Sequence, residues 1–321
     1  MIWDQLQKSL LTELSQRIDS RAEESDRQSL HNLSEEFYGR FPAEDMRERS
    51  VENLYGSLYG LLRFLQSRPD TEPKIRIFNP EIQSHGWESK YTVIAIVCRG
   101  IPFSTASVRG ELNRRNLTIH GIASCNLAVS RDKEGNLLAV LADGDPQQHA
   151  QPEEAVLYFE IGRHSNPEQL EELRQTLADI LGEVALVVDD FPLMLQRLQE
   201  AEEAIRGSEC VDNAVREEAA EFLQGLQNGH ITMPGYEYLQ VHHHSPPIVQ
   251  VEVDSKASLG LLRHRVTRGA DDLRADLEHM SADELHRRQL SFSKSRVRSR
   301  VHRLTYPDYI EVKVFDDKGE V

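Results

Sequence analysis

The sequence is poor in cysteine and in aromatic side chains, and it contains no long apolar run. Only three of its 321 residues are cysteines, and they are widely spaced (Cys98, Cys125 and Cys210). Such a set excludes a disulfide framework and a CxxC metal or redox motif, and it favours a reducing cytoplasm. No segment approaches the roughly 18 consecutive apolar residues of a membrane-spanning helix. The first residues show neither a basic region nor an apolar stretch, so we expect no secretory signal.

Motifs of catalytic and cofactor-binding proteins are also missing. No G-x-G-x-x-G follows an expected strand and no G-x-x-x-x-G-K-[ST] occurs, so we expect no nucleotide cofactor in this chain. H-E-x-x-H and G-x-S-x-G are absent as well. His242 and His244 would share one face of a strand, and His230 precedes them, but two histidines make an incomplete metal site. We therefore expect no bound metal and no activity from this chain alone.

Charge is unevenly distributed. Hydrophobic residues make up 39% and charged residues 28%, which suits an ordinary globular core. The net charge of −16 argues against wholesale binding to nucleic acid or to an anionic membrane. Residues 151–230 hold 18 acidic and five basic side chains, whereas residues 285–303 hold seven basic side chains and no acid. This asymmetry is consistent with two domains that touch each other and equally with an outside partner.

Residues 1–70 are predicted to be helical. Ser50 is a suitable cap for a second helix, and residues 68–73 form a linker rich in proline and charge. Gly56 and Gly60 are four residues apart, so we expect that helix to fit tightly against a neighbour. The two apolar stripes consist of Ile2, Trp3, Leu6, Leu10, Leu14 and Ile18, and of Leu54, Leu58, Leu61, Leu62 and Leu65.

Residues 71–192 are predicted to form a ferredoxin-like βαββαβ domain, an antiparallel sheet with both helices on one face. A short edge strand is expected at 74–79 before this unit. A helix from 166 and a last strand at Glu183–Val188 would complete it, although 183–206 also suits one continued helix. The intervening elements are a buried strand at 91–98, a helix that ends at Asn116, strand character at 117–130, a turn at 132–136, and strands at 137–141 and 155–161.

The remaining residues indicate connecting helices at 193–230 and a second α+β domain at 231–321. A helix is expected at 211–228 and strands at 235–241, 248–253, 295–303 and 309–315. Asp316-Asp-Lys-Gly319 is a strong hairpin turn, yet only two residues follow it. A hairpin without its return strand leaves backbone groups unpaired, so we expect the chain to be a fragment that is cut inside its last domain.

The turn between the buried strand and the first helix is the first candidate binding site. Backbone N–H groups at a helix N-terminus and the helix dipole attract a carboxylate, and Gly100 permits close approach to the backbone. Ordinary turn chemistry would place the same residues here. The candidate residues are Arg99, Gly100, Ile101, Pro102, Phe103 and Ser104.

A basic stretch is the second candidate site. Its alternating cations would share one face of a strand, where they could hold phosphate groups, while Val297 and Val301 would face a core. Alternatively the row meets an acidic surface such as that of residues 151–230, or is solvated, because no aromatic residues interleave with it. The residues are Lys294, Arg296, Arg298, Arg300, His302 and Arg303.

A series of short segments resembles one known family, in the same order along the chain. They are Phe37-Tyr-Gly-Arg-Phe-Pro42, Arg76-Ile-Phe-Asn-Pro80, His85-Gly-Trp87, Tyr91-Thr-Val93, Ile101-Pro-Phe103, Leu117-Thr-Ile-His120, Leu259-Gly-Leu-Leu262, Lys294-Ser-Arg296, Ser299-Arg-Val-His-Arg303, Asp308-Tyr309 and Val312-Lys-Val-Phe-Asp316. Their order resembles that of the large bacterial NAD-specific glutamate dehydrogenases over about residues 31–321.

The resemblance implies a regulatory N-terminal segment in which an ACT domain of ferredoxin-like fold precedes a PAS-like α+β domain. It implies that NAD and the catalytic domains belong to other parts of the same polypeptide, that the protein forms homo-oligomers, and that the ACT unit binds an effector amino acid. Two segments depart from the family pattern near the presumed ligand end of that unit. They are Ser104-Thr-Ala106, where the family has an acid, and Ala123-Ser-Cys125, where a His-Pro pair is usual.

Overall fold

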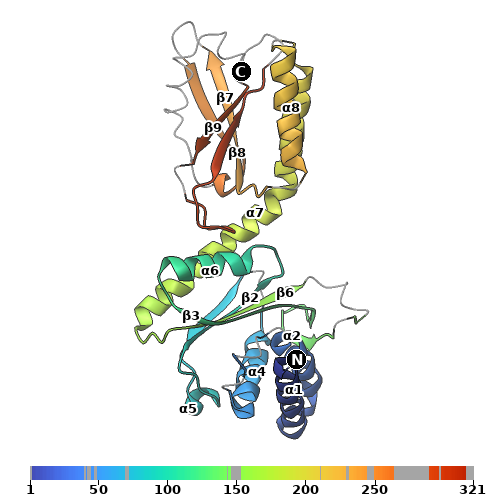
Figure 1. Ribbon diagram of the computed structural model, residues 1–321, viewed down its shortest axis with the longest axis vertical. Coiled ribbons are helices and arrows are strands. Elements are labelled where there is room, and N and C mark those ends of the chain that lie inside the picture. Colours follow the sequence, from blue (N-terminus) through green and yellow to red (C-terminus); the bar gives the residue numbers. More distant parts are fainter. Residues whose placement is uncertain are drawn as a thin grey trace. The chain divides into compact units, whose positions relative to one another are not determined.

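The computed structural model describes most of the chain in two compact units, residues 1–182 and 183–321 (Figure 1). The described residues are 2–39, 41, 45–46, 49–68, 72–142, 144–145, 153–209, 211–228, 231–243, 249–263, 289–295 and 298–315. Within these ranges, no helix is both long enough and apolar enough to cross a membrane. Several features discussed above lie outside the described residues: Cys210, His230, His244, Arg296, Val297 and the turn at 316–319.

A four-stranded antiparallel sheet forms the centre of the first unit. Its strands lie in the order β1-β2-β6-β3. The strands are β1 (Lys74–Phe78), β2 (Thr92–Arg99), β3 (Ile119–Leu127) and β6 (Glu154–Ile161). Because β6 separates β2 from β3, Cys98 and Cys125 lie on strands that are not neighbours, as predicted, and neither forms a disulfide.

Helices cover both faces of this sheet (Figure 1). Ile94 and Ile96 of β2 pack with side chains of α6 (Ser104–Arg114) and α7 (Pro167–Gly207), which share one face as predicted. Val93 and Val97 point the other way into a core with α1 (Ile2–Arg21), α2 (Glu24–Tyr38) and α4 (Val51–Leu65). Residues on both faces of β2 and β6 are therefore buried, which explains their continuous apolar runs. The second helical layer was not predicted.

The strand predicted at Glu183–Val188 was wrong, and the alternative of one continued helix through 183–206 is confirmed. Helix α7 continues without a break through this segment to Gly207. Val184 and Val187 continue the buried helical stripe of Leu177 and Ile180, so burial along one helix face overrides the β-propensity of the valines. The edge position beside β2 is occupied instead by β1, which is the edge strand predicted at 74–79.

A buried carboxylate joins three segments of the first unit. Glu154, at the start of β6, accepts two hydrogen bonds of 2.8 Å from Arg131 and one of 3.0 Å from Arg68. Arg131 ends strand β4 (Val129–Arg131), which pairs with β5 (Leu137–Val140), and Arg68 follows α4. The side chain of Glu154 is 7% exposed and those of Arg68 and Arg131 are 9% and 12% exposed, so one carboxylate pairs with two guanidinium groups largely away from water.

The predicted close packing at Gly56 and Gly60 is also present. Both glycines lie on α4 beside Trp87, which is 4% exposed and follows the short helix α5 (Ile82–His85). A Cβ atom on Gly56 would lie 2.6 Å from Cβ of Trp87, whereas one on Gly60 would be 3.5 Å from Nε1 of the indole. An added side chain at Gly56 would therefore clash with this loop, whereas one at Gly60 would not.

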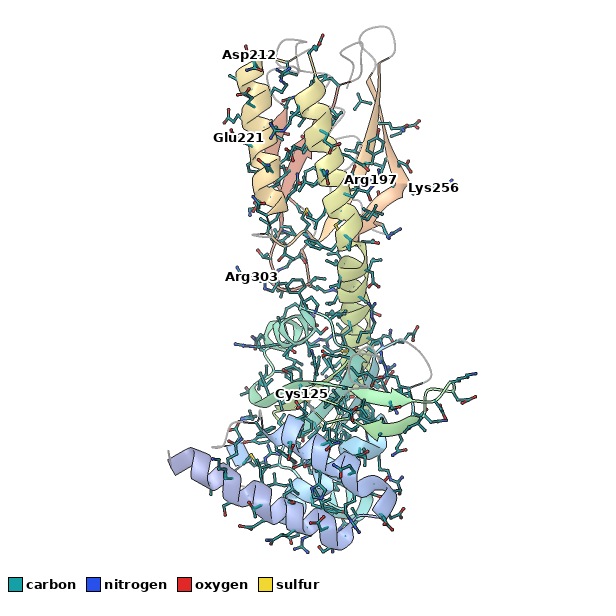
Figure 2. All side chains as sticks on the ribbon, turned by 90° about the vertical axis from the view of Figure 1, so that its right-hand side faces the viewer. Cys125, Arg197, Asp212, Glu221, Lys256 and Arg303 are labelled. Carbon is teal, nitrogen blue, oxygen red and sulfur yellow. The ribbon has the colours of Figure 1, made fainter. Side chains whose placement is uncertain are left out.

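The second unit contains the C-terminal part of α7, helix α8 (Asn213–Gln227) and two antiparallel strand pairs. Asp212, at the start of α8, caps the helix by accepting a hydrogen bond from the backbone N–H of Ala214 (Figure 2). The strands are β7 (Gly235–His243) with β8 (Val249–Gly260), and β9 (Leu290–Lys294) with β10 (Asp308–Val312). The predicted helix at 211–228 and strands at 235–241, 248–253 and 309–315 are confirmed with shifted ends, and the chain is α+β as predicted.

The strand predicted at 295–303 was wrong. Strand β9 ends at Lys294, and the backbone N–H of Ser299 donates a hydrogen bond to the carbonyl of Thr305. His302, between them, has a φ of 63°, the left-handed conformation of a tight turn. The described cations of this segment therefore lie along a turn that folds back on itself, not along one face of an extended strand. Val301 is buried, as predicted.

Candidate functional site

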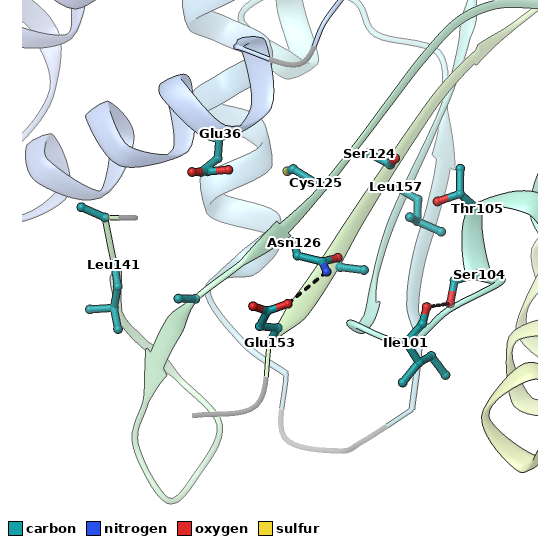
Figure 3. A pocket seen from close by; sticks show the side chains of 13 residues that line it. Glu36, Ile101, Ser104, Thr105, Ser124, Cys125, Asn126, Leu141, Glu153 and Leu157 are labelled. Atoms are coloured by element: carbon teal, nitrogen blue, oxygen red, sulfur yellow. Dashed lines mark hydrogen bonds between the residues drawn. The ribbon is translucent and has the colours of Figure 1, made fainter. Parts of the chain in front are cut away.

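A cavity of about 440 Å³ lies in the first unit, beside the turn that joins β2 to α6 (Figure 3). Strands β3 and β6, helix α2, the residues after β5 and the start of α6 supply its walls. The lining residues are Glu36, Ile101, Ser104, Thr105, Ser124, Cys125, Asn126, Ala128, Leu141, Ala142, Glu153, Ala155 and Leu157. Its volume is in the range of small-molecule sites.

The β2–α6 turn is held in place by its own backbone. The N–H of Gly100 donates a 2.8 Å hydrogen bond to the carbonyl of Glu153, and a Cβ on Gly100 would lie 3.0 Å from that oxygen. Phe103 adopts a φ of 72° before the first residue of α6, and the Ser104 hydroxyl donates to the carbonyl of Ile101. The missing side chain at Gly100 thus lets the turn lie close to the backbone of Glu153.

The structure brings part of the predicted turn site to the cavity. Of the six residues predicted, Ile101 and Ser104 line it. Arg99, Gly100, Pro102 and Phe103 belong to the same turn but are not among its lining residues. Both departures from the family pattern contribute to the cavity, through Ser104 and Thr105 at one side and Ser124 and Cys125 at another (Figure 3).

Several lining residues were not predicted. Glu36 comes from α2, which the sequence places in a separate helical region, Asn126 lies near the end of β3, and Glu153 directly precedes β6. The Asn126 side chain donates a 3.0 Å hydrogen bond to Glu153 Oε2 (Figure 3). No local sequence pattern marks Glu36, because its proximity to β3 arises only when α2 packs on the sheet.

Helix α2 is fixed against the rim of this cavity. The side chain of Asn32 donates a 2.7 Å hydrogen bond to the carbonyl of Val140, and the backbone N–H of Val140 donates to Oγ of Ser29 at 3.2 Å. Leu141 and Ala142, which follow directly, line the cavity. These two bonds therefore position Glu36 as well as the segment after β5.

The cavity is acidic. Glu36 and Glu153 are the charged side chains among the described lining residues, and lysine, arginine and histidine are absent from that set. The hydroxyls of Ser104, Thr105 and Ser124 supply neutral hydrogen-bonding groups. Nearby, burial raises the pKa of the Cys98 thiol to about 11, so this thiol stays protonated at neutral pH and is a poor nucleophile.

The basic stretch forms internal contacts in the second unit. Arg300 pairs with Glu183, a member of the acidic block at 151–230, and Lys294 pairs with Asp308 at 2.6 Å. The guanidinium of Arg298 lies 6.0 Å from the ring centroid of Tyr306. Arg303 is exposed (Figure 2). Of the alternatives considered for the basic stretch, Arg300 therefore shows contact with an acidic side chain of residues 151–230. In the described residues, no group of three or more potential metal ligands occurs.

Comparison with known proteins identifies the first unit. The family model described as "Glutamate dehydrogenase, ACT1 domain" matches residues 33–177, a range that contains the sheet, α6 and the cavity. An NAD-specific glutamate dehydrogenase of Halomonas elongata is 36% identical over 317 residues, or 97% of this chain. A second, from Pseudomonas aeruginosa, is 31% identical over 291 residues, or 90% of this chain.

The chain spans 19% and 18% of the lengths of these two relatives, so it corresponds to about a fifth of such a protein. The similarity nevertheless extends across both units and includes the turn and the strand ends that form the cavity. The chain belongs to the NAD-specific glutamate dehydrogenase family, as a segment that carries the ACT1 domain.

Proposed function

We propose that this chain is a regulatory and assembly segment of an NAD-specific glutamate dehydrogenase. The observation that carries the proposal is the coincidence of the ACT1 match with a small-molecule cavity beside the β2–α6 turn. Oxidative deamination of L-glutamate to 2-oxoglutarate, with NAD, would be performed by catalytic domains elsewhere in the same cytoplasmic polypeptide. This segment would bind no NAD itself.

The first unit would act as the sensor. An amino acid in the cavity would place its carboxylate near the first turn of α6, where the helix dipole is favourable, and its other groups among the hydroxyls of Ser104, Thr105 and Ser124. Binding regulates the distant active site only if the effector binds two states of the protein with different affinity. The enzyme's substrates would then alter effector affinity by the same factor.

The second unit would serve assembly. We assign residues 71–192 to the ACT domain, 193–230 to connecting helices and 231–321 to a PAS-like domain. The pairing of helices α7 and α8 with β9 and β10 supports an α+β domain of this kind. The first unit would also contribute to assembly, because its nine-residue strand β3 lies at the edge of the sheet, a position suited to contact with another domain or subunit of a homo-oligomer.

Calorimetric titration of the 321-residue chain with the 20 common amino acids tests the sensor function. We expect saturable heat from a subset of them, with dissociation constants between about 1 μM and 1 mM, the usual range for small metabolites. The Ser124→Phe variant should give no such heat, because its larger side chain would fill the cavity. If no amino acid gives heat at a concentration 10 times the upper limit of this range of dissociation constants, effector binding is refuted.

The regulatory assignment also predicts that the isolated chain has no dehydrogenase activity. Mixing it with L-glutamate and NAD should give no rise in absorbance of the reduced cofactor above that of the buffer. A full-length family member at the same concentration serves as the positive control. Turnover by the chain alone would show that it carries a catalytic centre and would contradict the assignment.

A further inference from the structure

Strand β3 changes from apolar to polar toward the cavity, on the face of the sheet that α6 covers. The β3 residues on this face are Ile122, Ser124 and Asn126, which pair with Phe159, Leu157 and Ala155 of β6. All three β6 residues are buried in the core beneath α6. Two polar side chains thus continue apolar rows of the sheet at the end where the cavity lies, and both line that cavity.

A second hydroxyl reaches the same part of the cavity from the helix. Thr105 is the second residue of α6, and Figure 3 shows its side chain and that of Ser124 coming from α6 and β3, with Leu157 between them in this view. Leu157 is 1% exposed. Two walls of the cavity therefore each present a hydroxyl beside an apolar floor.

These two hydroxyls differ from other polar groups of the lining because they are unpaired. Within the described ranges of the chain, neither Thr105 nor Ser124 makes a side-chain hydrogen bond to another residue. By contrast, the hydroxyl of Ser104 donates to a carbonyl of its own turn, and the amide of Asn126 donates to Glu153. The donor and the acceptor positions of both hydroxyls thus remain open to whatever occupies the cavity.

We propose that this cavity selects an amino acid with an uncharged hydrogen-bonding side chain, a hydroxyl or an amide, and that Thr105 and Ser124 determine this preference. The inference rests on the proposed effector site and adds the chemical class of its ligand. Hydroxyls that a ligand shields from water lower its affinity unless the ligand pairs them. An aliphatic side chain of the same shape leaves both unpaired, whereas a hydroxyl or an amide donates and accepts.

An ionised side chain is poorly matched to this part of the cavity. Its floor consists of Leu157 and Ala155, which are 1% and 4% exposed. Two neutral hydroxyls do not offset the cost of removing a full charge from water beside such a surface. The same hydroxyls suffice for a neutral polar group, whose desolvation costs far less. The preference is therefore for a polar group without charge.

Titration calorimetry of the 321-residue chain with isosteric amino acids tests the proposal. L-threonine and L-valine differ by one hydroxyl, L-asparagine and L-leucine differ by an amide, and L-aspartate replaces this amide by a carboxylate. We expect heat from L-threonine, L-asparagine or both, with binding at least about 10-fold tighter than that of the aliphatic isostere. L-aspartate should give no heat.

Hydroxyl-removing variants locate the effect. Thr105→Val and Ser124→Ala should each weaken binding of the polar probe about 10-fold, and the double variant should bind the polar probe and its aliphatic isostere equally. This loss of discrimination distinguishes recognition from a general loss of fold. Thr12→Val removes a hydroxyl from an exposed position of α1 outside the cavity and should change neither affinity. Thermal melts of each variant without ligand check that the fold is retained.

The outcomes separate this inference from the proposed function. Equal or tighter binding of an aliphatic isostere, or heat from other amino acids and none from L-threonine and L-asparagine, would overturn the polar preference and leave the cavity as an effector site. A polar preference that persists in the double variant would overturn the role of Thr105 and Ser124. Absence of heat from every amino acid would overturn both the inference and the effector site.

Discussion

Replacing Glu154 with glutamine is expected to lower the free energy of unfolding of the first unit by about 3 to 5 kcal/mol. The change leaves Arg68 and Arg131 buried beside a neutral amide, although both now donate hydrogen bonds to the carboxylate. Breaking a buried pair by removal of one partner is costly because the remaining charge is uncompensated. Urea unfolding at pH 7, followed by circular dichroism, measures the change.

The loss of stability in Glu154→Gln should become smaller as the pH is lowered. Burial acts to raise the pKa of Glu154, but the hydrogen bonds and charges of Arg131 and Arg68 outweigh it and hold this pKa below its ordinary value. A carboxylate with a depressed folded-state pKa stabilises the protein above its unfolded-state pKa, near 4.5, and loses this contribution as pH falls through the folded-state value. The difference between wild type and Glu154→Gln should therefore shrink below about pH 4.5.

Glu171→Gln provides the control for this prediction. Glu171 is exposed and pairs with Arg174 on the surface of α7, so its replacement should leave unfolding unchanged within error. If Glu154→Gln behaves like this surface variant at pH 7, the three-charge contact does not stabilise the fold and our description of it is wrong.

Gly56→Ala is expected to destabilise the first unit by about 1 to 2 kcal/mol. An added Cβ would lie 2.6 Å from Cβ of Trp87 and 3.2 Å from the carbonyl oxygen of Gly86, so the loop itself would have to move. Overpacking of this kind costs about 1 to 3 kcal/mol, and alanine returns up to about 1 kcal/mol through its better helix propensity. The melting temperature should fall by a few degrees.

Gly60→Ala is the matched control on the same helix. Its added Cβ would make an ordinary contact of 3.5 Å with the Trp87 ring, so the gain in helix propensity should dominate. We expect this variant to melt at the same temperature as wild type or slightly above it. Equal changes at both glycines would contradict the close approach at Gly56.

The sequence predicted those features that depend on local pattern. The buried runs at 91–98 and 155–161, the turn at 132–136 and the helix capped by Ser50 all appear where apolar periodicity and capping residues indicated them. The close approach at Gly56 was also predictable, since small residues four apart mark one face of a helix.

Features that depend on tertiary packing could not be predicted. The valines at Glu183–Val188 favour a strand locally, but the segment continues α7, which buries Val184 and Val187. The alternation of cations at 294–303 indicated an extended face, yet the left-handed His302 turns the chain back. Glu36 joins the cavity from a helix more than 60 residues before the β2–α6 turn, a proximity that no local spacing encodes.

Hydrogen–deuterium exchange of the 321-residue chain, with and without a saturating amino acid that binds in the calorimetric titration, tests the central claim most directly. We expect slower exchange in three separate segments: residues 101–107 of the β2–α6 turn and the first residues of α6, residues 123–127 of β3, and residues 29–36 of α2. Strands β7 to β10 should be unchanged. Protection confined to the second unit, or none in any segment, would contradict an effector cavity built between the helical layer and the sheet.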